Sequence, residues 1–275
     1  MDAYIAALEY FLPLQELSTE QISALHPQWS AEKIDAKTGI KTRHLAAGDQ
    51  HASDLALAAA RKLFQSGVCE PSAIDFILLC TQTPDFAMPT TACLLQHQLG
   101  VPSSAGALDI NLACSGFIYG LGLAKGLIIS GQARCLLLLT ANTLSKFIDP
   151  NDRNSATIFG DGASATLVLA GNEMDSSIGP LVYGTNGQDG LDIVVLNSGT
   201  RTGACATSRV TCPSSEKRDR PRFIMNGRKV FDFVLDTVPK SVTALYSKLR
   251  CEKRTPICSS SIKRMLSFWR SSGAF

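Results

Sequence analysis

Hydrophobic and polar positions along the first 170 residues follow two alternating patterns. Short continuous apolar runs, typical of buried strands, alternate with longer segments whose apolar residues recur at helical spacing. We expect strands at 4–10, 74–81, 107–110, 134–140 and 165–170, and helices at 54–66, 90–99 and 115–130. This order predicts an α/β fold in which helices cover both faces of a sheet.

The expected helices carry recognisable boundary residues. Ser53 is a candidate N-cap for the helix at 54–66, and Gly67 and Gly100 follow the ends of the first two helices. The helix at 115–130 carries a single charge, Lys125, so we expect it to be buried nearly all round. Its glycines reduce helix propensity unless close packing requires them, which predicts a central helix pressed against a partner.

The pattern begins again after about residue 175. Apolar runs occupy 178–183 and 191–196, and a long amphipathic helix is expected near 230–249, interrupted by Pro239. Between them, 199–222 is rich in serine, threonine and charge and predicts a surface loop. We therefore divide the chain into an N-terminal half, a partial C-terminal half and a basic, serine-rich tail, at 1–174, 175–250 and 251–275.

Composition narrows the class of protein. The 275 residues are 45% hydrophobic and 18% charged, which is typical of a globular chain. A net charge of +2 disfavours binding to nucleic acid or to an anionic membrane surface. We expect neither a secretory signal nor a membrane span.

Nine cysteines, an odd number without a Cys-x-x-Cys pair, disfavour a zinc or redox centre and predict a cytoplasmic protein. We expect eight of them to be small buried hydrophobic residues. Cys114 differs because it lies between a strand and a helix, where unpaired N–H groups stabilise the thiolate, the nucleophilic form of cysteine. Cys114 is therefore the candidate nucleophile, and an inert core cysteine is the alternative.

Two other motifs admit more than one interpretation. The sequence Phe-Gly-Asp-Gly at 159–162 resembles a phosphate loop, but a tight turn before a strand explains it better, because no lysine follows in the Walker pattern. Asp149 and Asp152 could suggest a metal pair, whereas Pro150 and Asn151 between them favour a turn. We expect no metal and no tightly bound cofactor.

Five motifs occur in order along residues 1 to about 250: Thr38-Gly39-Ile40 with Arg43-His44, then 109–117, 149–153, 159–163, and Met225-Asn226-Gly227 with Val230-Phe231. Together they resemble those of beta-ketoacyl-acyl carrier protein synthase III. The resemblance implies a thiolase-like fold with layers α-β-α-β-α, its second half incomplete here, and a homodimer. It also implies a decarboxylating Claisen condensation, in which acyl-coenzyme A loads an acyl group onto Cys114 for joining to malonyl-acyl carrier protein.

The resemblance also implies a set of substrate-binding residues. Arg153 matches an arginine that binds coenzyme A, and Gly227 matches a glycine that lines the pocket; Phe231, in the same motif, joins them. Met88 falls at the position that reaches across the dimer into the partner's acyl pocket. As isolated residues, Arg153 would be assigned to a solvated loop and Met88 to ordinary core.

The mouth of the implied pocket departs from the family pattern. Lys33 and Lys37 stand where the family commonly has tryptophan and arginine. A lysine can meet a phosphate as a point charge, but it neither stacks like tryptophan nor forks like arginine. Trp29 lies nearby but off register, either as a packing residue or as a displaced stacking partner.

The second half lacks the family's catalytic histidine and asparagine. The only histidines are His26, His44, His51 and His97. We therefore expect at most slow self-acylation and no condensation by this chain alone. The alternatives are a non-catalytic homologue or partner subunit, and, with motifs that fit less closely, a neighbouring condensing enzyme.

The tail at 251–275 carries five basic residues, one acidic residue and six serines. Its composition predicts poor order. One interpretation is a frameshift or early stop that replaced the family's end, and the other is a short membrane- or partner-binding segment at 262–269.

Overall fold

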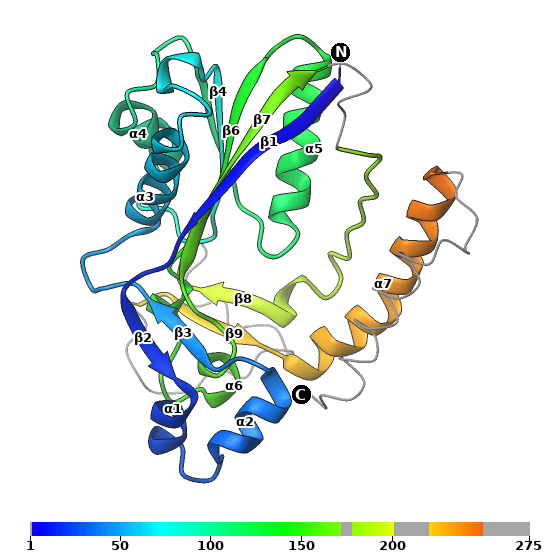
Figure 1. The fold of residues 1–275 in the computed structure, drawn as a ribbon. Coiled ribbons are helices and arrows are strands. Elements are labelled where there is room, and N and C mark those ends of the chain that lie inside the picture. The colour runs from blue at the N-terminus through cyan, green and yellow to red at the C-terminus, as the bar shows by residue number, and fades with distance from the viewer. Residues whose placement is uncertain (1, 172–177, 201–219, 250–275) are drawn as a thin grey trace. The chain divides into compact units, whose positions relative to one another are not determined.

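The computed structural model describes residues 2–171, 178–200 and 220–249 (Figure 1). The expected tail at 251–275 and most of the expected loop at 199–222 lie outside these ranges. The described residues form two compact units. The first takes in those of Met1–Glu16, His44–Ser145 and Gly160–Leu181, and the second those of Leu17–Arg43, Lys146–Phe159 and Val182–Phe275.

The first unit is built on a five-stranded sheet in the order β1-β7-β6-β4-β5. Strand β4 pairs in parallel with β5 and β6, whereas β7 pairs antiparallel with β6 and β1. The strands are β1 (Asp2–Phe11), β4 (Phe76–Cys80), β5 (Gly106–Ile110), β6 (Cys135–Asn142) and β7 (Gly162–Gly171). All five strands expected from the apolar runs are therefore confirmed.

The central strands are apolar along nearly their whole length because both of their faces are covered. In β6, Leu136 to Leu139 are all completely buried, and in β4 Ile77, Leu78 and Leu79 are too. Successive side chains of a strand point to opposite faces, so such runs need a helix layer on each side. The expected two-sided cover is confirmed within this unit.

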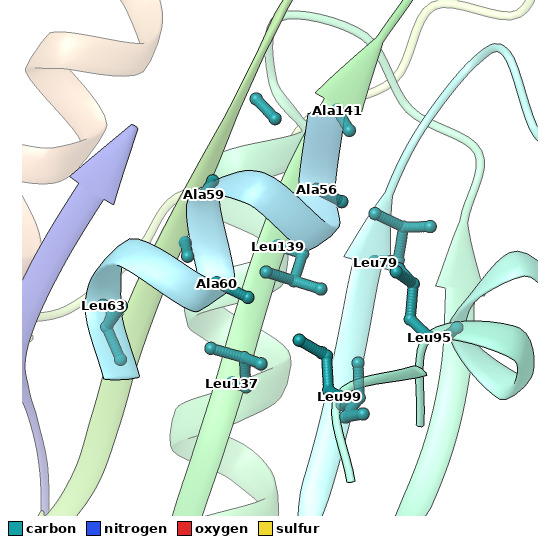
Figure 2. Packing of buried hydrophobic residues seen from close by; sticks show 14 of the residues in the cluster. Ala56, Ala59, Ala60, Leu63, Leu79, Leu95, Leu99, Leu137, Leu139 and Ala141 are labelled. Atoms are coloured by element: carbon teal, nitrogen blue, oxygen red, sulfur yellow. The ribbon is translucent and has the colours of Figure 1, made fainter. Parts of the chain in front are cut away.

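Helices α3 (Ala52–Gln65) and α4 (Thr91–Gln98) cover one face of the sheet. The core there combines large side chains from the strands with small ones from α3, as Figure 2 shows for Leu137 and Leu139 beside Ala56 and Ala60. Alanine at these α3 positions lets the helix backbone approach the strands closely. Burial of the leucines stabilises the unit by about 1.5–3 kcal/mol each.

Helix α5 (Gly116–Ile129) covers the opposite face. Leu121, Ala124 and Ile128 pack with Leu136 and Leu138 of β6 in a second core. The prediction that α5 is buried nearly all round is wrong, because its outer apolar residues are exposed. The outer apolar side chains are 44–53% exposed, namely those of Ile118, Leu123 and Ile129.

The boundaries of α3 correct one prediction and confirm another. The N-cap is His51 rather than Ser53, and the backbone N–H of His51 donates to the Asp54 carboxylate at 2.8 Å. Ser53 instead lies inside the helix and donates from its hydroxyl to Asp85. Gly67 and Gly100 both have positive φ, 76° and 71°, as expected for residues that follow helix ends.

The remaining elements are shorter, apart from one long helix. A two-stranded sheet joins β2 (Gln15–Ser18) to β3 (Thr42–Leu45), and β8 (Ile193–Leu196) pairs antiparallel with β9 (Arg222–Met225). The helices are α1 (Thr19–Leu25), α2 (Ala31–Thr38), α6 (Arg153–Ala156) and α7 (Gly227–Leu249), with 3-10 turns at Pro71–Ala73, Leu144–Lys146 and Gly190–Asp192. Two interpretations need correction: the apolar run at 178–183 forms no strand, and Arg222 begins a strand rather than ending a loop.

Helix α7 continues through Pro239, so the expected interruption is wrong. Proline removes one backbone donor, which costs most where water cannot replace the lost bond. Pro239 is exposed and no residue of α7 is buried, so water reaches the backbone there. Within the described ranges, the length and apolarity needed to cross a membrane are not combined in any helix.

Candidate active site

Cys114 lies in the turn that connects β5 to α5, two residues before the first residue of the helix, Gly116. Its thiol is free and exposed. The first amides of a helix have no partner within the helix and carry partial positive charge. Cys114 is therefore exposed immediately before the N-cap residue of α5, Ser115.

The turn before α5 is fixed to the sheet by hydrogen bonds. The thiol of Cys80, the last residue of β4, donates to the Leu112 carbonyl at 3.1 Å. The next residue of that segment, Thr81, donates its N–H to the Ile110 carbonyl at 3.1 Å. The N–H of Gly116 closes the turn by donating to the Ala113 carbonyl at 2.8 Å.

Gly116 is required by the close approach of Cys80. A Cβ at position 116 would lie 2.0 Å from the Cys80 Sγ and 3.3 Å from the Leu112 Cβ. The helix can start this near to β4 only with glycine at that position. The expectation that helix glycines serve close packing is confirmed here and at Gly120, where a Cβ would lie 2.6 Å from a Leu138 methyl group, but Gly126 has no neighbour within 4 Å.

The described cysteines differ in environment. Burial raises the pKa of the Cys80 thiol, so it stays protonated and packs as a small hydrophobic residue, as expected. The same expectation is wrong for Cys93, which is exposed, while Cys69 and Cys135 are half-buried. Cys205, Cys212, Cys251 and Cys258 lie outside the described residues.

Met88 lies in an exposed loop of the same unit. Its side chain is 82% exposed, and nearby Phe86 is 59% exposed. The base of the loop is anchored, because the Asp85 carboxylate accepts from the N–H and hydroxyl of Ser53, and the Asp85 N–H donates to the Thr91 hydroxyl. A firm base with an exposed apolar tip suits a contact with another surface rather than ordinary core.

Asp109 has a role that sequence reasoning missed. Its carboxylate, on β5, accepts from the N–H groups of Thr91 and Ala92 at 2.7 and 2.8 Å, at the start of α4. A carboxylate at a helix N-terminus is favoured by the helix dipole. The signal was a single acid inside an otherwise apolar strand, five residues before Cys114.

The other predicted substrate-binding residues belong to the second unit. Lys33 and Lys37 lie on α2, exposed and half-buried respectively. Arg153 is the first residue of α6, Gly227 is the first residue of α7, and Phe231 lies half-buried one turn into α7. The structure therefore places these five residues in one compact unit, and Cys114 and Met88 in the other.

Trp29 contacts one of these lysines. The Lys37 ammonium lies 5.2 Å from the centroid of the Trp29 ring, within the range of a cation–π interaction. Of the two interpretations of Trp29, this contact favours a packing residue. It also holds Lys37 against the loop that precedes α2.

Arg43 links three segments of the second unit and was not assigned a role from sequence. Arg43 is 3% exposed as a whole residue. Its guanidinium donates to the Thr157 carbonyl from Nε and Nη2, to the Thr19 hydroxyl at 2.7 Å and to the Thr38 hydroxyl at 3.4 Å. Burial lowers the pKa of Arg43, and the charge of Asp35 opposes that shift. The network ties the end of α2 to the segment after α6.

Two of the chain's histidines are engaged with the backbone. A ring nitrogen of His26 lies 3.1 Å from the Pro150 carbonyl oxygen, and one of His44 lies 2.7 Å from the Pro13 carbonyl oxygen. His51 and His97 are exposed at the start and end of helices. These positions match structural roles.

The acidic turns also have structural roles. Asp149 pairs with Arg222 at 3.1 Å, and Asp152 accepts from the Ser155 hydroxyl at 2.7 Å. Asp161, in the motif at 159–162, is buried and accepts from the N–H groups of Ala46 and Ser145. The strand expected after the motif at 159–162 is confirmed, because β7 begins at Gly162. The turn itself lies just before the motif, at residues 157–158.

A family model and solved structures identify the fold class of this chain. The family model for 3-oxoacyl-[acyl-carrier-protein] synthase III matches residues 108–187, which include Cys114 and all of α5. One crystal structure of a 3-oxoacyl-(acyl-carrier-protein) synthase III has a TM-score of 0.81 at 45% identity, covering 90% of this chain and 74% of that chain. The expected thiolase-like α/β fold is confirmed.

Relatives from named organisms agree. The synthase III of Thermus thermophilus has a TM-score of 0.75 at 32% identity, and the match covers 89% of this chain and 72% of the Thermus chain. That of Pseudomonas aeruginosa PAO1 has a TM-score of 0.72 at 29% identity, with 90% and 71% covered. The chain belongs to the 3-oxoacyl-(acyl-carrier-protein) synthase III family.

Proposed function

We propose that this chain is an acyltransferase of fatty-acid biosynthesis that accepts an acyl group from acyl-coenzyme A on Cys114. The observation that carries the proposal is the free, exposed thiol of Cys114 in the turn before α5, in a chain of this family. Cys80 and Gly116 support the proposal because their packing fixes where the helix starts relative to the thiol.

The loading step is a thioester exchange. The Cys114 thiolate attacks the carbonyl carbon of the acyl thioester, and the carbonyl oxygen takes up negative charge that backbone N–H groups, including that of Cys114, stabilise. The carbon–sulfur bond to coenzyme A then breaks. Coenzyme A leaves as a thiolate and takes a proton, and Cys114 keeps the acyl group.

Coenzyme A recognition is assigned to the second unit. In this proposal Lys33, Lys37 and Arg153 supply positive charge for its phosphates, and Gly227 and Phe231 contact the rest of the coenzyme. The exposed position of Lys33 supports this part of the proposal, because its charge can reach a phosphate in solvent. Lysine lacks the fork of arginine, so we expect weak binding that depends strongly on salt.

The second substrate in the proposal is malonyl-acyl carrier protein. The active assembly is a homodimer in which Met88 of each protomer reaches into the acyl pocket of its partner. Condensation would break the bond between the malonyl α-carbon and its carboxylate, which releases carbon dioxide. The resulting carbanion would attack the acyl carbonyl carbon, and the carbon–sulfur bond to Cys114 would break to restore the thiolate. The 275 residues contain no histidine after His97 to promote this step. We therefore propose that this chain loads acyl groups slowly and does not condense them unaided, with no metal or cofactor involved.

Loading is tested by intact-mass measurement after incubation with a series of acyl-coenzyme A thioesters. The proposal predicts one acyl adduct per chain, absent in Cys114→Ser. Cys93→Ser is the matched control, because Cys93 is also exposed in the first unit and its replacement leaves the adduct in place. An adduct that persists in Cys114→Ser would contradict the proposal.

A second candidate, a non-catalytic homologue or partner subunit, is favoured by the absence of that histidine. It predicts a folded chain that binds other copies but gives no acyl adduct with any thioester. Adding malonyl-acyl carrier protein to the acylated protein tests whether the chain only loads an acyl group or also condenses it. Ketoacyl product formed by this chain alone would contradict both candidates.

A further inference from the structure

Two cysteines face each other outside the candidate active site. The Sγ atoms of Cys69 and Cys135 lie 3.7 Å apart, although 66 residues separate them in sequence. Cys69 follows α3 and precedes the 3-10 turn at Pro71–Ala73, and Cys135 is the first residue of β6. Both are half-buried free thiols, and both belong to the first unit.

We propose that Cys69 and Cys135 form a site of reversible covalent modification by small-molecule disulfides, and that the modification ends in a disulfide bond between these two residues. A disulfide requires the two sulfur atoms to approach to about 2.05 Å. A separation of 3.7 Å places the two sulfur atoms in van der Waals contact, so rotation of the two side chains brings them closer. The site is independent of Cys114 and of the proposed acyl transfer.

The backbone around the pair is held in place. The Asp75 carboxylate accepts from the N–H groups of Arg134 and Cys135, and the Asp75 N–H donates to the Cys135 carbonyl. The Cys69 thiol donates to the Glu70 carbonyl at 3.2 Å. Because Asp75 immediately precedes β4, these bonds hold the starts of two parallel strands beside the segment that carries Cys69.

The surroundings favour uncharged forms of the pair. Burial raises the pKa of both thiols, that of Cys135 to about 12, and the charges of Glu70 beside Cys69 and of Asp75 beside Cys135 act in the same direction. The protonated thiols and the disulfide are both uncharged, so neither incurs the cost of a buried charge. Since the thiolate is the attacking species, exchange is slow at neutral pH and accelerates as pH rises.

The exchange takes place in two steps. Cys69, between the exposed residues Val68 and Glu70, attacks one sulfur of glutathione disulfide and releases one glutathione. Cys135 then attacks the Cys69 sulfur of the mixed disulfide and releases the second glutathione. The two protein thiols lose two electrons and two protons, and one glutathione disulfide becomes two glutathione thiols.

The test treats the full chain with excess glutathione disulfide at pH 8 and maps its peptides without reduction. The expected result is a cross-linked peptide pair containing Cys69 and Cys135, with the loss of two hydrogens and no glutathione retained at either residue. The bond closes a long loop, so the melting temperature should rise by several degrees and return after dithiothreitol.

Single substitutions make the outcome decisive. Cys135→Ser should stop the reaction at a glutathione adduct on Cys69 and abolish the rise in melting temperature, whereas Cys93→Ser should leave cross-link and rise unchanged. The proposal is overturned if Cys69 and Cys135 are recovered as free thiols or as separate adducts while exposed Cys93 is modified. Circular dichroism of each variant confirms that it is folded.

Discussion

The Sγ atom of Cys80 occupies the space that any side chain at position 116 would need, because a Cβ there would lie 2.0 Å from it. This relationship sets where α5 starts and therefore where Cys114 lies. The same Sγ donates to the Leu112 carbonyl, so one buried thiol fixes both sides of the turn. A structural cysteine thus supports the proposed catalytic one.

Gly116→Ala should destabilise the fold and slow acyl loading on Cys114. The added methyl group overlaps the Cys80 Sγ, and overpacking of this kind costs about 1–3 kcal/mol of unfolding free energy. Adding Cys80→Ala to Gly116→Ala removes the overlap, so the double variant should be more stable than the sum of the two single changes predicts. Urea unfolding of the four proteins measures the coupling.

The control for that series lies in the same helix. Gly126 has ordinary helical geometry and no atom within 4 Å of an added Cβ. Gly126→Ala should therefore raise the unfolding free energy by about 0.5–1 kcal/mol and leave loading unchanged. Equal destabilisation by Gly116→Ala and Gly126→Ala would refute the packing argument.

Arg43→Met should loosen the second unit. Removing the guanidinium leaves the Thr157 carbonyl and the Thr19 hydroxyl without a buried donor, which costs about 2–4 kcal/mol. Hydrogen exchange should accelerate in peptides that cover α1 and α2. Lys41→Met is the control, because it removes an exposed cation two residues away, and unchanged exchange in Arg43→Met would count against the network.

Thiol reactivity should separate the cysteines by pH. Burial raises the pKa of Cys135 to about 12 and also raises the pKa of Cys80, so both thiols stay protonated at pH 8. Iodoacetamide should therefore label exposed Cys93 and Cys114 first, and Cys80 and Cys135 only in urea. Prompt labelling of Cys80 in the folded protein would contradict its assignment as a structural residue.

The raised pKa of Cys135 also gives stability a pH dependence. A thiol whose pKa is raised in the folded state binds its proton more tightly there than in the unfolded state. The contribution of Cys135 to the free energy of unfolding is therefore complete below pH 9.0, the ordinary pKa of a cysteine thiol, and is lost as pH rises toward about 12. Unfolding free energy should decline between pH 9 and 10.5, and less steeply in Cys135→Ala. Parallel curves for the two proteins would exclude this cause.

Asp109→Asn should loosen the start of α4 and the loop that carries Met88. The carboxylate accepts from two amides at that helix start, so neutralising it should cost about 0.5–2 kcal/mol. Faster hydrogen exchange at residues 84–95 is the expected readout. Asp54→Asn is the comparison, since Asp54 accepts from the His51 N–H at the start of α3 and its loss should leave 84–95 unchanged.

The strands of the first unit could be predicted because their signal is local. Runs such as Ile77–Leu79 and Leu136–Leu139 are apolar enough to require cover on both faces, and the structure buries all of them. The helix that follows Cys114 could be predicted from the contrast between a strand-like run and a glycine-rich segment. The role of Cys114 as a nucleophile stays a prediction, as do the roles of Lys33, Lys37 and the other proposed substrate-binding residues.

Interactions between distant residues could not be predicted from local pattern. Ser53 has the chemistry of an N-cap, but Asp85, 32 residues away, binds its hydroxyl. Pro239 normally disfavours a helix, yet its exposed position lets α7 continue. The roles of Arg43 and Asp109 depend on partners that only the folded chain brings together. The exposed outer face of α5 could not be predicted either, because its residues are as apolar as those that contact the sheet.

The most direct test of the account is the mass of the chain after exposure to acyl-coenzyme A, followed by peptide mapping. We predict a single acyl group on Cys114, formed slowly, removed by hydroxylamine and missing from Cys114→Ser. If the wild-type protein stays unmodified after exposure to acyl-coenzyme A thioesters of every chain length tested, or if the acyl group maps to another cysteine, Cys114 is not the acyl-carrying residue.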